Sequence, residues 1–67
     1  MATKLKEVRT SKFMTQLDLA QAVGVTENAV RQWELGNSKP FPRHQKKLVE
    51  MFQMDINILL QPAVNVA

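Results

Sequence analysis

Cysteine is absent from this sequence, and histidine, glycine and aromatic residues are scarce. Without cysteine there is no disulfide and no thiolate metal site, and His44 alone cannot form a zinc site. The longest uninterrupted apolar run covers Ile58, Leu59 and Leu60, too short for a transmembrane helix or a secretory signal. These absences exclude disulfide-linked, zinc-binding and membrane-spanning classes, and they predict a cytoplasmic protein.

The composition that remains is that of a small folded globule. The chain has 67 residues, of which 45% are hydrophobic and 22% are charged, so we expect one domain over residues 1–67. A net charge of +3 favours an anionic partner without identifying it. No nucleophile–base–acid set, phosphate-binding loop or metal cluster is present, so we predict no catalytic residue, no cofactor, no small-molecule ligand and no enzyme activity.

Apolar residues recur with the period of an α-helix, and patterns typical of strands are nearly absent. The sequence predicts an all-α domain with helices over residues 3–12, 16–23, 27–35 and 42–53 and a short fifth helix after Asp55, broken by Pro62. Helix ends are indicated by N-caps at Thr3, Thr15, Thr26 and Asp55, by glycines that stop helices at Gly24 and Gly36, and by Pro42 at a first helical position. Apolar side chains expected in the core include Leu5, Val8, Leu19, Val23, Val30, Trp33, Leu48 and Leu59; Phe13, Met14, Met51 and Phe52 are expected in the core or on a partner surface.

Residues 16–35 carry the most specific pattern. Two short helices are joined by a connection too short for antiparallel packing, which indicates a helix-turn-helix. Ala20 is small where the helices cross, Gly24 suits the positive φ of the turn, and Val25 fills the angle between the helices. Trp33 shares a face with Val30, so we assign it to the core and not to base stacking.

At this segment the chain resembles the Cro/CI-type helix-turn-helix repressors of phages and bacteria, also called the Xre family. The similarity covers roughly residues 4–60 and rests on residues in matching register: Gln16, Ala20, Gly24, Val30, Trp33, Glu34 and Gly36. It implies a compact five-helix, lambda-repressor-like fold that binds double-stranded DNA. One difference is Gln53, where the family often has glycine, and it leaves the end of the fourth helix open.

The resemblance also implies roles for individual residues. The expected base-reading residues are Thr26, Glu27, Asn28, Arg31 and Gln32; the expected DNA-backbone contacts are Gln16, Asn37, Ser38, Lys39 and Arg43; and Arg9 with Glu34 is the expected structural ion pair. Asn28 or Gln32 suits adenine, and Arg31 suits guanine or a phosphate. Glu27 either accepts a hydrogen bond from cytosine or only complements the helix dipole.

The function implied is a Cro-like phage or bacterial repressor that binds a palindromic operator as a homodimer, at least on DNA. The alternative is an antitoxin that also binds its own operator, for which only the tail 61–67 offers an extra binding segment. The apolar residues of the fifth helix, with Val64 and Val66, either pack onto the first helix or form the dimer interface. The length suggests a stand-alone regulator or a DNA-binding fragment of a larger repressor.

Overall fold

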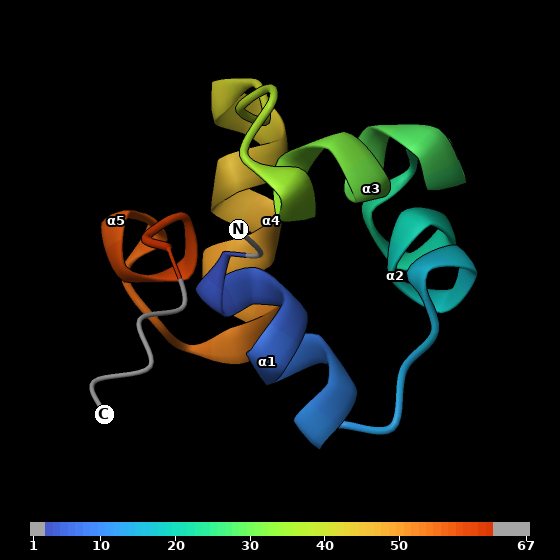
Figure 1. Cartoon of the computed structure of the whole chain (residues 1–67), viewed down its shortest axis with the longest axis horizontal. Coiled ribbons are helices and arrows are strands. Elements are labelled where there is room, and N and C mark those ends of the chain that lie inside the picture. Colours follow the sequence, from blue (N-terminus) through green and yellow to red (C-terminus); the bar gives the residue numbers. More distant parts are fainter. Residues whose placement is uncertain (1–2, 63–67) are drawn as a thin grey trace.

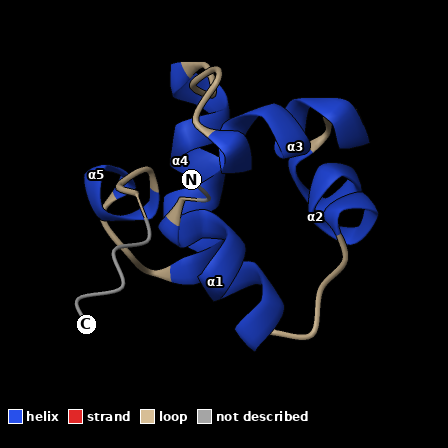
Figure 2. Ribbon diagram, viewed as in Figure 1, coloured by secondary structure: helices blue, strands red, loops and turns tan. Residues whose placement is uncertain are grey.

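The computed structural model of the protein describes residues 3–62, which form five α-helices and no extended strand (Figures 1 and 2). The helices are α1 (Lys4–Ser11), α2 (Gln16–Val23), α3 (Glu27–Leu35), α4 (Pro42–Phe52) and α5 (Ile56–Leu59). The predicted all-α class is confirmed, and the first four helices lie within one residue of their predicted limits.

All five helices contribute to one core. α2 and α3 lie together on one side of the molecule, with α1, α4 and α5 on the other (Figure 1). Four fully buried leucines, from α1, α2, α4 and α5, each stabilise the fold by about 1.5–3 kcal/mol. The buried set is Leu5, Leu19, Ala20, Val30, Trp33, Leu48, Phe52 and Leu59. Because α3 packs against α1 and α2, one side of α3 is buried against these helices and the opposite side remains at the surface.

Local side-chain caps fix most helix ends as predicted. At α2, the Asp18 N–H donates to Thr15 Oγ1 at 3.0 Å and the Thr15 N–H donates back to Asp18 Oδ2 at 2.9 Å, which is a capping box. The pKa of Asp18 is lowered below its ordinary value of 3.8, mainly by the hydrogen bond from the Thr15 backbone and to a smaller extent by the Thr15 side chain. At α5, the Asn57 N–H donates to Asp55 Oδ1 at 2.7 Å.

Thr3 differs from its predicted role. It occupies the N-cap position of α1, but its side chain accepts no capping hydrogen bond, and its buried Oγ1 has no partner. Its backbone N–H donates instead to the Glu34 carbonyl oxygen at 2.8 Å, and Thr3 forms an isolated antiparallel bridge with Pro62. Thr3 is therefore held by α3 and by the chain after α5, and its own helix contacts it through the backbone, where the Lys6 N–H donates to the Thr3 carbonyl oxygen at 3.1 Å.

Of the two places expected for Phe13, the core or a partner surface, the structure excludes the core. Its side chain is 96% exposed, so it takes no part in the core, whereas Met14 next to it is packed against the core. Phe13 lies in the turn after α1 with φ 59°, a left-handed conformation in which its side chain is directed away from the helices on either side. Met51 is half-buried and Phe52 is buried, as expected.

Gln53 ends α4 in the position where the resembling family often has glycine. Its φ of 54° is left-handed, and its N–H donates to the Val49 carbonyl oxygen at 2.7 Å. Helix α4 therefore ends where the sequence predicted, even though glycine is missing. A side chain at this conformation costs about 1–2 kcal/mol, because its Cβ crowds the neighbouring carbonyl.

Replacing Gln53 with glycine is expected to raise the free energy of unfolding by about 0.5–1 kcal/mol, since relief of the strain exceeds the added flexibility of the unfolded chain. Urea unfolding followed by the fluorescence of Trp33, the sole tryptophan, measures the change. The matched control is Gln21→Gly, an exposed position within α2, which should lose about 1 kcal/mol. A loss in both variants would contradict the strain at Gln53.

Candidate nucleic-acid interface

The turn between α2 and α3 sets the angle of the two helices. Gly24 ends α2 with φ 89°, and the N–H of Val25 donates to the Ala20 carbonyl oxygen at 2.9 Å. Thr26 then starts α3, where its Oγ1 accepts from the Ala29 N–H at 3.1 Å. Ala20 is 1% exposed, so no larger side chain separates the helices at their crossing. Residues 16–35 thus form the predicted helix-turn-helix.

The exposed side of α3 gathers the side chains that were predicted to read bases. Val30, Trp33 and Glu34 are buried, which confirms Trp33 as a core residue. Spacings of three and four residues place Asn28, Arg31 and Gln32 on one surface of the helix. The structure leaves Thr26, Glu27, Asn28 and Arg31 exposed and Gln32 partly exposed. The Thr26 hydroxyl oxygen also caps α3, so this residue has a structural role as well.

The predicted backbone contacts after α3 flank this surface. Asn37, Ser38 and Lys39 are exposed in the loop between α3 and α4, and Arg43 is exposed in the first turn of α4. The Arg43 guanidinium lies over the Phe41 ring, 5.4 Å from its centroid, in a cation–π arrangement. The loop and the start of α4 therefore carry cationic side chains next to the uncharged amides of α3.

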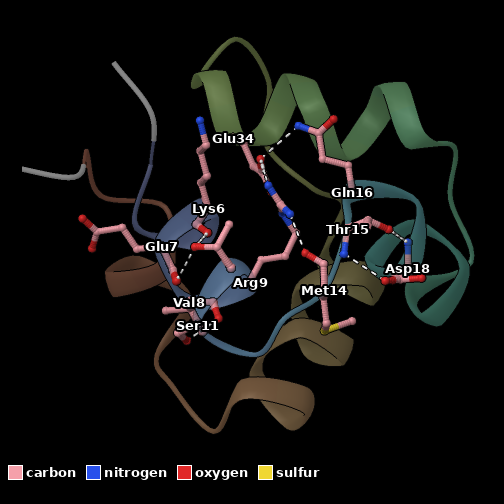
Figure 3. Close-up of polar contacts among 11 residues, drawn as sticks. Lys6, Glu7, Val8, Arg9, Ser11, Met14, Thr15, Gln16, Asp18 and Glu34 are labelled. Atoms are coloured by element: carbon pink, nitrogen blue, oxygen red, sulfur yellow. Dashed lines mark hydrogen bonds and ion pairs between the residues drawn. The ribbon is translucent and has the colours of Figure 1, made fainter.

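Gln16 is engaged within the protein. It is the first residue of α2, and its Nε2 donates to Glu34 Oε1 at 3.1 Å (Figure 3). Because Nε2 carries two hydrogens, a second donor remains for a ligand. The sequence contained no local signal for this contact, since the two residues are 18 positions apart.

A buried ion pair lies at the centre of the same network (Figure 3). Arg9 of α1 donates from Nε to Glu34 Oε2 and from Nη2 to Glu34 Oε1, the second at 3.1 Å. Its Nη1 donates to the carbonyl oxygen of Met14, in the segment that leads into α2, at 2.6 Å. The side chains of Arg9 and Glu34 are 8% and 3% exposed. The expected Arg9–Glu34 pair thus joins α1 to α3, and the contact of Gln16 with the same carboxylate adds α2, which was not expected.

His44 has surroundings that the sequence did not indicate. It is half-buried, its ring centroid lies 5.9 Å from that of Trp33 and 6.1 Å from that of Phe41, and its buried Nδ1 has no hydrogen-bond partner. The three rings border a cleft of about 300 Å³ between the start of α3 and the following loop. These contacts of His44 depend on the proximity of α3 and α4, which is a tertiary feature.

Residues 3–62 contain no group of three or more histidine, cysteine, aspartate or glutamate side chains placed to hold a metal ion. Within the same range, no helix has both the length and the apolar character needed to cross a membrane. The same residues carry an exposed polar face on α3, with cationic side chains beside it.

Comparison with known proteins agrees with this geometry. A sequence profile of the family described as "Helix-turn-helix" matches residues 5–59. The HTH-type transcriptional activator BcrR of Enterococcus faecalis is 35% identical over 57 residues, which cover 85% of this chain and 28% of that protein. The chain thus spans less than a third of the length of this relative. No solved structure gives a significant match. The profile match and the geometry of residues 16–35 together show that the chain belongs to the Cro/CI-type (Xre) helix-turn-helix family of DNA-binding proteins.

Proposed function

We propose that this protein is a sequence-specific transcription regulator that inserts α3 into the major groove of an operator. The observation that carries the proposal is the exposed polar side of α3, which begins at a helix N-terminus and is bordered by Lys39 and Arg43. An α-helix fits the major groove, and its N-terminal residues approach base edges first. The uncharged amides then choose the sequence, and the flanking cations bind phosphates.

The side chains of α3 differ in what they contribute. Asn28 and Gln32 carry amides, which pair with adenine through one donor and one acceptor. Arg31 supplies a cation for guanine or for a phosphate. Glu27 lies in the first turn of α3, where its charge complements the helix dipole, and it binds DNA only where it faces a cytosine amino group.

Gln16 and the α3–α4 loop hold the DNA backbone in this proposal. The free donor of Gln16 and the N-terminus of α2 face one phosphate, and the exposed side chains of Ser38, Lys39 and Arg43 follow the backbone on the other side of α3. Such contacts supply affinity that is independent of sequence and falls with salt.

The proposal includes a homodimer on a palindromic operator. Ile58 of α5 is 42% exposed, and Ile56 and Leu60 are half-buried, so an apolar surface remains beside α1. Val64 and Val66, expected to extend this surface, lie outside the described residues. A two-fold dimer presents two recognition helices to one DNA face, so half-sites should be about 10 base pairs apart. Repression, as in Cro-like regulators, requires only that the bound dimer block a promoter; a reporter assay distinguishes it from activation.

Selection from a random DNA pool, followed by gel shift at several salt concentrations, tests the proposal. A consensus of two inverted half-sites supports it. Binding to all sequences with equal affinity would contradict it, as would no binding at low salt.

Removal of one phosphate contact has a specific expected result. Lys39→Ala should weaken binding to the selected operator and to unrelated DNA alike, and it should reduce the slope of log affinity against log salt by about 1. The control is Lys6→Ala, which removes the same charge from exposed α1 and should leave the slope unchanged. Equal slopes for Lys39→Ala and the unmodified protein would exclude a phosphate contact at Lys39.

A further inference from the structure

Three amide side chains form a hydrogen-bonded series along the exposed side of α3, which we name the amide ladder: Asn28, Gln32 and Asn37. Asn37 Nδ2 donates to Gln32 Oε1 at 2.9 Å, and Gln32 Nε2 donates to Asn28 Oδ1 at 3.5 Å. All the donors point in one direction, from the C-terminal end of α3 toward its N-terminal end. The ladder therefore has a polarity.

The backbone after α3 fixes the position of Asn37. Gly36 has φ 80°, its N–H donates to the Trp33 carbonyl oxygen at 3.1 Å, and the Asn37 N–H donates to the Gln32 carbonyl oxygen at 3.0 Å. This pair of bonds is a Schellman motif, and it turns the chain back over the last turn of the helix. Asn37 thus contacts Gln32 through both its backbone and its side chain, and Gln32 lies one helical turn from Asn28.

The polarity decides which amide keeps free groups. Gln32 is engaged at both ends, because its oxygen accepts from Asn37 and its nitrogen donates to Asn28. Asn28 uses one lone pair of its oxygen, and no residue in the range 3–62 accepts a hydrogen bond from its nitrogen. A donor and an acceptor lone pair therefore remain side by side on Asn28, and adenine N7 and N6 require this pair of groups. Asn28 is also the second residue of α3, at the end that approaches bases first.

We infer that Asn28 reads an adenine and that Gln32 and Asn37 are positioning residues that hold its amide in the required orientation. The inference rests on the proposed function, since it needs α3 in the major groove. It assigns Asn37 a role different from the phosphate contact that the family resemblance implied, and it separates Asn28 from Gln32, which the sequence left equivalent.

The experiment uses the full chain and the operator obtained by selection. Each adenine of a half-site is replaced in turn by 7-deazaadenine, which lacks the N7 acceptor, and affinities are measured at fixed salt. The adenine read by Asn28 is the one whose replacement by 7-deazaadenine lowers the affinity of the unmodified protein but not that of Asn28→Ala. At this position, Asn37→Ala is expected to reduce the discrimination between adenine and 7-deazaadenine about 2- to 10-fold. Asn57→Ala, an exposed asparagine of α5, serves as the matched control and should leave it unchanged.

The dependence on sequence separates positioning from a phosphate contact, because a phosphate contact strengthens binding to all sequences alike. Reduced discrimination by Asn37→Ala at the adenine read by Asn28 supports the inference. Unchanged discrimination overturns it, as does an equal loss for all sequences. A protein with no preferred sequence overturns the proposed function as well, whereas a retained preference that Asn37→Ala does not alter overturns this inference alone. Because Asn37 is exposed, the thermal unfolding of Asn37→Ala should match that of the unmodified protein.

Discussion

Replacing Glu34 with alanine is expected to lower the free energy of unfolding by about 3–5 kcal/mol, because Arg9 then stays buried without a counter-charge. The same change removes the acceptor of Gln16. A small domain has about 5 kcal/mol of stability, so the variant should be largely unfolded near 25 °C. Urea titrations in sucrose, which favours the folded state, followed by Trp33 fluorescence, keep the transition measurable.

A double-mutant cycle isolates the ion pair from other effects. Arg9→Ala alone should also be strongly destabilising, since it leaves the Glu34 carboxylate buried, and the double variant should lose less than the sum of the two single losses. Strictly additive losses would contradict a direct coupling between the two side chains. The control is Glu50→Ala, an exposed glutamate of α4, which should change stability by no more than about 0.5 kcal/mol.

Removing the Asn28 side chain is expected to reduce the preference for the selected operator over a site with the wrong base by about 5- to 150-fold, because a bidentate contact to one base discriminates by about 1–3 kcal/mol. Competition gel shifts at one salt concentration measure this ratio. Folding should be unaffected, since Asn28 is exposed. The effect is on sequence choice and not on general attraction to DNA, so binding to unrelated DNA should change little.

Two comparisons make the Asn28 result specific. Gln32→Ala should also reduce the preference for the selected operator, but less strongly than Asn28→Ala, because Gln32 acts by orienting the Asn28 amide. Lys39→Ala should leave the preference intact while lowering all affinities. If both Asn28→Ala and Gln32→Ala kept the full operator preference, the exposed side of α3 would not be the reading surface.

The helix limits followed from the sequence because they depend on local interactions. Thr15 and Asp18 are three residues apart, and Thr26 caps an N–H three residues later, so the cap pattern is visible along the chain. Gln53 and Phe13 depart from the local rules, because each adopts a left-handed conformation without being glycine.

The reading surface was predictable for a related reason. Helical periodicity separates Val30 and Trp33 from Asn28 and Arg31, so burial of one set exposes the other. The ion pair of Arg9 with Glu34 spans 25 residues, and periodicity alone gives no indication of it; the family resemblance supplied the expectation. Neither periodicity nor the family resemblance indicated the environment of His44 or the exposure of Phe13, so the sequence left both open.

By itself, the sequence determined the five helices, most of their caps, the helix-turn-helix and the set of side chains on each face of α3, because backbone hydrogen bonds and side-chain periodicity act within a few residues. The tertiary structure decided which polar groups are already engaged. Gln16 bonds to Glu34, and Asn37 returns to Gln32 through the turn at Gly36. A hydrogen bond forms only when donor and acceptor lie about 3 Å apart, and that distance depends on how the helices pack and how the chain turns between them.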